Sequence, residues 1–190
     1  GASPNCVVRQ NAEGLLEPFL NAAKELANAG VAGITTSCGF LSLFQTELSE
    51  ATGLPVAASC LMQVPWVQSL LPPNSQVGIV TISASKLTPN HLNLAGAPAN
   101  TPVIGMGSSQ TFKRVIFNDE QEMDIDQCRA DIIIAARKLC RQHPNVRALV
   151  LECTNMAPYT ADVARTLKMP VFDFYSFVTW FQAGLAPRQF

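Results

Sequence analysis

Hydrophobic spacing in the first third of the chain switches between a helical and a strand-like period. From Ala12 to Ala29, apolar residues recur every three or four positions and Gly30 follows, so the pattern predicts an amphipathic helix. The apolar run VAGIT (31–35) predicts a strand, LSLFQTELSEA (41–51) a second helix, and PVAAS (55–59) a second strand. This order indicates parallel strands covered by helices.

The same alternation continues to the C-terminus, after a linker that ends in Pro-Pro-Asn (72–74). The further predicted elements are a strand at 76–82, a helix at 87–94, a strand at 102–106, a helix at 127–141, a strand at 170–174 and a final helix. We therefore expect an α/β fold.

Two segments of the chain repeat each other at an offset of 115 residues. VAGITTSC (31–38) aligns with VRALVLEC (146–153), and a Pro-Val pair begins seventeen residues after the cysteine in both copies. The repeat predicts two pseudo-symmetric lobes, each a parallel sheet flanked by helices, with the active site in the cleft between them. We expect lobe 1 at residues 1–74, joined by a C-terminal helix at 175–190, and lobe 2 at residues 75–174.

One strand of the second copy has no counterpart in the first. The offset would place the partner of strand 76–82 before residue 1, so lobe 1 lacks its first strand and we expect the native chain to extend beyond Gly1.

Composition narrows the possible classes of function. Only 14% of the residues are charged, which favours a homodimer or higher homo-oligomer. The 13 basic and 14 acidic residues give a net charge of -1 without a basic run, so nucleic acid is not an expected partner. Neither an apolar stretch of about 18 residues nor a signal peptide is evident, which predicts a cytoplasmic protein without a membrane partner.

Cys38 and Cys153 are the candidate catalytic residues. Each follows a strand of the repeat, at the edge where ligands bind in parallel α/β sheets. Each also lies at or just before a helix N-terminus, which is expected to favour the thiolate. Two thiols that face each other could take a proton from one side of a carbon and return one to the other side. The remaining cysteines are predicted to be core residues: Cys6, Cys60, Cys128 and Cys140.

Polar residues near these cysteines are candidates for substrate binding, because an enolate forming beside a carboxylate needs hydrogen-bond donors. They are Thr36, Ser37, Gly39, Thr81, Ser83, Thr154 and Asn155. Glu152 is either a residue that tunes Cys153 or an ordinary polar strand end. No metal site is predicted, because the cysteines form no CxxC pair, and no cofactor is predicted, because GMGSSQ (105–110) departs from the GxGxxG motif.

TTSCGF (35–40) and LECTNMAP (151–158) resemble the two cysteine motifs of the aspartate/glutamate racemase superfamily. The resemblance covers nearly the whole chain. It implies two lobes, no cofactor, often a dimer, and a two-base mechanism carried by Cys38 and Cys153. The chain differs from glutamate racemases at three positions: Asn155 replaces a His, Glu152 a Gly, and Gly39 an Asn.

The leading hypothesis is racemisation of an amino acid or a related carbon acid, such as a hydantoin, by the two cysteines. One alternative is cis-trans isomerisation of an alkene diacid such as maleate, with one cysteine as the nucleophile. Another is a non-catalytic protein that binds a small carboxylate on the same fold. Arylmalonate decarboxylases, which resemble the chain too, use one cysteine, so the presence of both argues against that activity.

Overall fold

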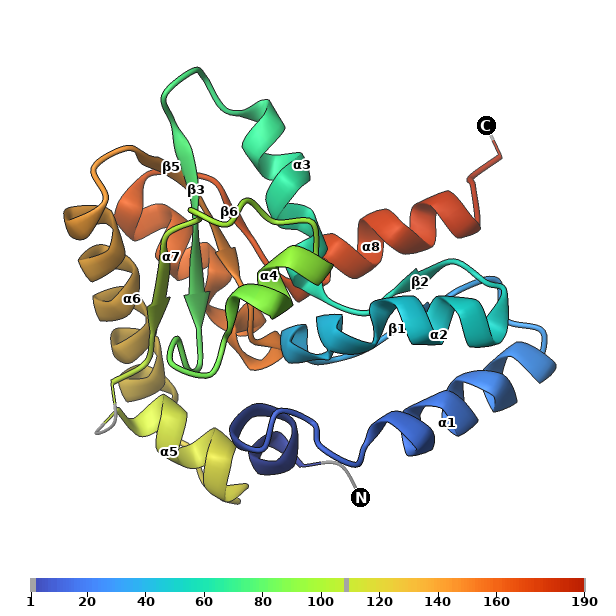
Figure 1. The fold of residues 1–190 in the computed structure, drawn as a ribbon. Coiled ribbons are helices and arrows are strands. Elements are labelled where there is room, and N and C mark those ends of the chain that lie inside the picture. Colours follow the sequence, from blue (N-terminus) through green and yellow to red (C-terminus); the bar gives the residue numbers. More distant parts are fainter. Residues whose placement is uncertain (1–2, 108–109, 190) are drawn as a thin grey trace.

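The computed structural model describes residues 3–107 and 110–189, which form two parallel sheets (Figure 1). Within these residues, the larger sheet has the order β4 (Val103–Gly105), β3 (Gln76–Thr81), β5 (Val146–Leu151) and β6 (Val171–Phe172). The smaller sheet pairs β1 (Ile34–Thr35) with β2 (Val56–Ala57). The predicted α/β fold with parallel sheets flanked by helices is confirmed.

Helices connect the strands along the whole chain. The α-helices are α1 (Leu16–Asn28), α2 (Gln45–Thr52), α3 (Gln63–Leu70), α4 (Pro89–Leu94), α5 (Thr111–Asn118), α6 (Ile125–Gln142), α7 (Thr160–Leu167) and α8 (Phe174–Leu185). Shorter turns are the π-helical η1 (Asn5–Arg9) and the 3-10 helices η2 (Gly39–Phe44), η3 (Cys60–Met62) and η4 (Thr154–Tyr159). None of the helices in the described part of the chain is both long and apolar enough to cross a membrane.

Several elements differ in length from their predicted bounds. The first predicted helix begins at Leu16 instead of Ala12, because Ala12 and Gly14 adopt left-handed backbone angles with φ of 53° and 72°. The strands of the smaller sheet are two residues long, shorter than the apolar runs that predicted them. The predicted linker that ends in Pro-Pro-Asn (72–74) is short, since α3 extends to Leu70.

The internal repeat of the sequence recurs in the secondary structure. Helices η2 and α2 have the same bounds as η4 and α7 after a shift of 115 residues. The pairing of Ile34 with Val56 becomes that of Leu149 with Val171 after the same shift. Cys38 and Cys153 therefore occupy equivalent positions, each directly before a 3-10 helix.

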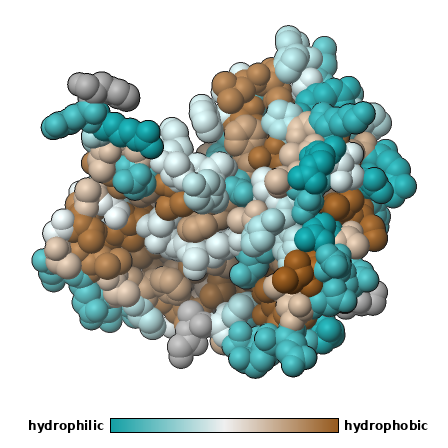
Figure 2. Space-filling model, turned by 180° about the vertical axis from the view of Figure 1, so that it is seen from behind, coloured by the Kyte–Doolittle hydropathy of each residue, from teal (hydrophilic) through white to brown (hydrophobic). Residues whose placement is uncertain are grey.

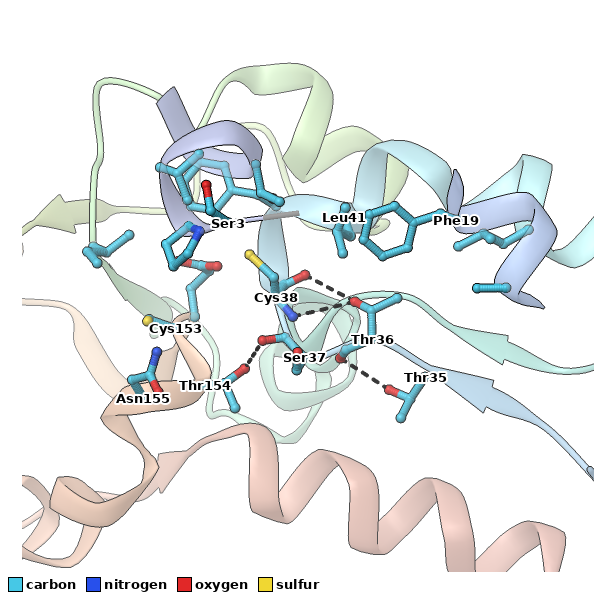
Figure 3. A pocket seen from close by; sticks show the side chains of 18 of the residues that line it. Ser3, Phe19, Thr35, Thr36, Ser37, Cys38, Leu41, Cys153, Thr154 and Asn155 are labelled. Carbon is cyan, nitrogen blue, oxygen red and sulfur yellow. Dashed lines mark hydrogen bonds between the residues drawn. The ribbon is translucent and has the colours of Figure 1, made fainter. Parts of the chain in front are cut away.

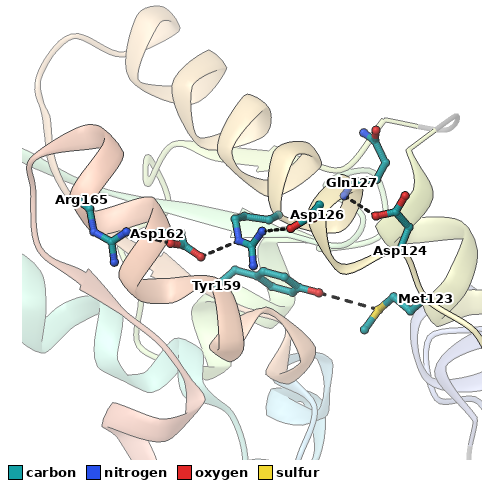
Figure 4. Close-up of polar contacts among 8 residues, drawn as sticks. Met123, Asp124, Asp126, Gln127, Tyr159, Asp162 and Arg165 are labelled. Carbon is teal, nitrogen blue, oxygen red and sulfur yellow. Dashed lines mark hydrogen bonds and ion pairs between the residues drawn. The ribbon is translucent and has the colours of Figure 1, made fainter.

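The core is centred on β3 and β5, whose apolar residues are almost completely buried. Helix α6 packs closely on β3, because a Cβ atom on Gly78 would lie 2.7 Å from Leu139 Cδ2. Strongly hydrophilic residues crowd the side covered by α6 and α7 (Figure 2). There Arg129 of α6 pairs with Asp126 and with Asp162 of α7, which also pairs with Arg165 (Figure 4).

Helix α8 extends from the larger sheet to the smaller one (Figure 1). Phe177 packs on Ala57 and Cys60, and a Cβ atom on Gly33 would lie 2.6 Å from Leu185 Cδ1. Asp173 begins the helix by accepting a hydrogen bond from the Ser176 N–H at 2.8 Å. Helix α8 thus links the end of β6 to β2 and to the residue that precedes β1.

Candidate active site

The loops that follow β1 and β5 meet at one pocket of about 450 Å³ (Figure 3). Its polar wall contains six of the predicted site residues: Thr36, Ser37, Cys38, Cys153, Thr154 and Asn155. Cys38 and Cys153 are both partly buried, and each has an extended backbone between the end of its strand and the 3-10 helix that follows. Two segments 115 residues apart in the sequence therefore present their thiols to the same space.

The opposite wall of the pocket is mainly apolar. It is formed by the N-terminal segment and one face of α1, including Val7, Val8, Phe19, Ala22 and Leu26. Sequence analysis did not assign this wall, because an apolar helix face has the same pattern whether it lines a pocket or a core. Among the described residues that line the pocket, none is Lys, Arg or His.

Threonine hydroxyls fix the main chain of the first cysteine loop. Thr36 Oγ1 donates to the Ala58 carbonyl at 2.5 Å and accepts from the Cys38 N–H at 3.5 Å. Thr35 Oγ1 donates to the Ala57 carbonyl at 2.8 Å. These bonds hold the loop on the end of β2, so the hydroxyl proton of Thr36 is already engaged within the protein.

Glu152 is a buried carboxylate beside both thiols, with only 1% of its surface exposed. Its Oε2 accepts a hydrogen bond from Thr81 Oγ1 at 2.7 Å. Burial raises the pKa of Glu152 from 4.5 to about 7, while hydrogen bonds from Thr81 and from the main chain of Ile82 and Gly39 oppose the shift. Sequence analysis left the role of this residue open, and the structure places it in the lining of the pocket that contains both cysteines.

Three predicted substrate contacts lie outside the pocket lining. Thr81 is fully buried and bonded to Glu152, and Ser83 is 5% exposed with its Oγ 3.4 Å from Ser85 Oγ. Gly39 is buried against Glu152, where an added Cβ atom would lie 2.6 Å from Glu152 Cγ. These residues support Glu152 and the loop around it.

The pKa values of both candidate thiols are raised, so the expected effect of the helix N-terminus, which lowers the pKa, is outweighed. Burial and then the charge of Glu152 raise the pKa of Cys38 from 9.0 to about 12, against one hydrogen bond from the Phe40 main chain. Burial, Glu152 and Cys38 likewise raise the pKa of Cys153. The 3-10 helices that follow are short, and loss of water outweighs their N–H groups.

A model of the Asp/Glu/hydantoin racemase family matches residues 14–180. The chain belongs to this family.

Its curated relatives include enzymes named for a sulfonium substrate. It is 27% identical over 150 residues to a dimethylsulfoniopropionate lyase of Durusdinium sp. clade D, covering 76% of this chain and 49% of that protein. It is 28% identical over 177 residues to dimethylsulfoniopropionate lyase 7 of Emiliania huxleyi, covering 88% of this chain and 51% of the relative. This racemase-family chain thus spans about half the length of the curated relatives it matches.

Solved structures share the fold at low sequence identity. Unliganded arylmalonate decarboxylase superposes with a TM-score of 0.62 at 17% identity, over 93% of this chain and 78% of that one. Glutamate racemase of Francisella tularensis in complex with D-glutamate has a TM-score of 0.56 at 18% identity, over 93% and 67% of the two chains.

Two departures of this racemase-family chain from the glutamate racemase pattern contact each other. Glu152 stands where those enzymes have Gly, and its side chain fills the space beside Gly39, where they have Asn. After the shift of 115 residues, Ser37 corresponds to Glu152 and Thr154 to Gly39, and Thr154 Oγ1 donates to the Ser37 carbonyl. The residue before each cysteine therefore contacts the residue after the other cysteine.

The other cysteines and His91 lie outside the pocket lining. Cys60 and Cys128 are buried as predicted, whereas Cys6 and Cys140 are partly exposed. Cys60 lies beneath the site, where its Sγ donates to the Glu152 carbonyl at 3.0 Å. His91 is fully buried, and its ring lies 5.1 Å from that of Phe40.

Proposed function

We propose that the protein removes a proton from the carbon next to the carboxylate of a small zwitterionic substrate, with Cys38 and Cys153 as the proton-transferring groups. One observation carries the proposal: the two thiols line one pocket from equivalent positions of the repeat. The pocket lining described lacks a cationic side chain that would pair with a second carboxylate. A substrate with one carboxylate and one positive group therefore suits the site better than maleate or another dicarboxylate.

The proposed base is a cysteine thiolate that forms transiently. A thiol whose pKa lies well above its ordinary value gives a stronger base once it loses its proton. Such a base is better matched to a weakly acidic C–H bond than an ordinary thiolate is. Ser37 and Asn155 line the pocket and are exposed, and they are the proposed donors for the substrate carboxylate, which gains charge as the proton leaves.

The first candidate reaction after proton removal is β-elimination, and the names of the curated relatives favour it. With dimethylsulfoniopropionate, the electron pair of the broken C–H bond would form a double bond between the α- and β-carbons. The bond from the β-carbon to sulfur would break, and its electrons would leave with sulfur as dimethyl sulfide. Acrylate would remain, and the cysteine would pass its proton to solvent.

The second candidate reaction is racemisation of an amino acid or a hydantoin, which the pair of cysteines favours. One thiolate would take the α-proton, and the other thiol would deliver its own proton to the opposite face. The carbon would invert, and no bond other than C–H would break.

Both reactions can be tested in one experiment in heavy water. The protein is incubated with dimethylsulfoniopropionate, amino acids and hydantoins, and we measure deuterium incorporation by mass spectrometry and dimethyl sulfide in the headspace. We expect activity on at least one compound and its loss in Cys38→Ala or Cys153→Ala. Cys128→Ala, which changes a buried cysteine of α6 outside the pocket, is the matched control and should retain activity. Full activity in both site variants would refute the proposal.

A further inference from the structure

The electrostatic character of the pocket depends on one fixed carboxylate. Apart from the two thiols, Glu152 is the ionisable side chain among the described residues of the lining. Its counterpart in the first half of the repeat is Ser37, so the charge is present in one half only. Any ligand that fills the pocket meets this carboxyl group beside Cys153, and the described residues of the lining include no cation to compensate its charge.

We propose that Glu152 determines substrate specificity by selecting molecules that carry a positive centre close to the reactive carbon. It disfavours molecules with a second negative group. This inference rests on the proposed function, because it names the substrate class of the same site.

Hydrogen bonds keep this carboxylate in place. Thr81 Oγ1, at the end of β3, holds Oε2 at 2.7 Å, and the main chain of Ile82 and Gly39 contributes further hydrogen bonds. The side chain occupies the space that a Cβ atom of Gly39 would need. Glu152 therefore cannot turn away from an unfavourable ligand without breaking bonds to β3 and to the Cys38 loop.

Burial makes the charge effective. Glu152 is 1% exposed, so little water separates it from the pocket, and charges interact more strongly where the effective dielectric constant is low. Phe19 on the opposite wall adds an aromatic surface of a kind that attracts ammonium and sulfonium groups. Both features favour the positive end of a zwitterion.

The protonation of Glu152 supports a pH-dependent preference. Its pKa of about 7 leaves part of the population neutral near neutral pH, and a bound cation would favour the charged form. The titratable groups that interact with it are Cys38, Cys60 and Cys153, whose pKa values are all raised, so they stay neutral over this range. The preference for a cationic ligand should therefore increase between about pH 6 and pH 8.

The test uses three ligands of nearly the same shape and different charge. They are 3-(trimethylammonio)propanoate, 4,4-dimethylpentanoate and 3-sulfopropanoate, which carry a positive, a neutral and a negative group at the same position. Isothermal titration calorimetry measures the dissociation constant of each for the unmodified protein, Glu152→Gln and Asp131→Asn. Asp131 is the matched control, because it is a buried, hydrogen-bonded carboxylate outside the pocket lining.

The unmodified protein should bind the cationic ligand about tenfold or more tightly than the neutral one, and the sulfonate most weakly. Glu152→Gln should reduce these ratios to about twofold, whereas Asp131→Asn should keep them. Unchanged ratios in Glu152→Gln, or no preference in the unmodified protein, would overturn the proposal. If Glu152→Gln does not fold, the unmodified protein alone tests the proposal. Its preference for the cationic ligand over the neutral one must then increase from about pH 6 to pH 8, and a preference that stays constant would overturn the proposal.

These ligands report on binding without turnover, so the two proposals can fail separately. Selective binding with neither deuterium incorporation nor dimethyl sulfide release in the panel would remove the proposed reaction and support the role of Glu152. Deuterium incorporation or dimethyl sulfide release without selective binding would support the reaction and remove the role of Glu152.

Discussion

Glu152→Gln should change how the free energy of unfolding depends on pH. Burial raises the pKa of Glu152 from 4.5 to about 7 in the folded protein. A group with a higher pKa in the folded state stabilises the fold fully below its unfolded pKa, and this contribution is lost as the pH rises through the folded pKa. The unmodified protein therefore loses stability from this group between pH 4.5 and about 7.

The size of the effect follows from that interval. At about 1.4 kcal/mol for each pH unit, the interval corresponds to roughly 3 kcal/mol. Glutamine does not titrate, so the variant should gain about this much relative to the unmodified protein between pH 4.5 and pH 8. Its amide also replaces one acceptor oxygen by a donor, which faces the donors of Thr81 and Gly39. That mismatch costs about 1–3 kcal/mol at every pH. The test is therefore how the difference in free energy of unfolding between the two proteins changes with pH, and not its value at a single pH.

The assay is urea unfolding of both proteins at pH 5, 6, 7 and 8, with a reductant for the six cysteines. Linear extrapolation gives the free energy of unfolding, and equal m-values confirm that the unfolded states are comparable. Thr81→Val removes a hydrogen bond that lowers the pKa of Glu152, so it should shift the loss of stability to higher pH. A constant difference between Glu152→Gln and the unmodified protein over this range would refute the reasoning.

Three further predictions concern the contacts around the two thiols. Gly39→Ala places a Cβ atom against Glu152 and should lower the free energy of unfolding by about 1–3 kcal/mol. Most of that loss should disappear when Glu152→Ala is present as well, in a double-mutant cycle measured by urea unfolding; equal losses in both backgrounds would contradict the contact. Thr154→Val removes the hydrogen bond to the Ser37 carbonyl and should slow deuterium incorporation or dimethyl sulfide release about tenfold or more, while the thermal midpoint changes little. If the variant loses activity only to the extent that it is unfolded, Thr154 has no positioning role. The rate of deuterium incorporation or of dimethyl sulfide release should rise with pH from pH 6 to pH 8, because the thiolate fraction of Cys38 increases with pH; the rise should be less than tenfold for each unit, because Glu152, whose charge raises the pKa of Cys38, becomes charged over the same range. A rate independent of pH would argue against a thiolate base.

The sequence was sufficient to predict the α/β fold and the repeat. The alternation of apolar runs and amphipathic segments reflects the local geometry of strands and helices, which each segment encodes by itself. The shift of 115 residues placed Cys38 and Cys153 in equivalent positions, and the structure has the same shift between η2 and η4. The length of the short strands was overestimated, because apolar side chains continue beyond the residues that pair in the sheet.

Contacts between distant segments were not predictable in the same way. Gly39 and Glu152 each departed from the glutamate racemase pattern, but nothing local to either position shows that one fills the space beside the other. The same holds for the thiol pKa values, which depend on how deeply Cys38 and Cys153 are buried and on the nearby Glu152 charge. The alignment of the repeat did contain one useful indication. It aligns Glu152 with Ser37, so the two halves of the repeat differ at the residue before the cysteine.

That difference bears on the choice between the two candidate reactions. A racemase works in both directions, so each of its two cysteines must act as the base for one enantiomer and as the acid for the other. Elimination from dimethylsulfoniopropionate, which has no stereocentre, needs one base only. In this protein Cys153 directly follows the buried Glu152, whereas Cys38 follows the exposed Ser37, so the surroundings of the two thiols differ. We infer that the broken symmetry favours the elimination. If Cys38→Ala and Cys153→Ala lower activity to very different extents, that inference gains support, and equal losses would favour racemisation.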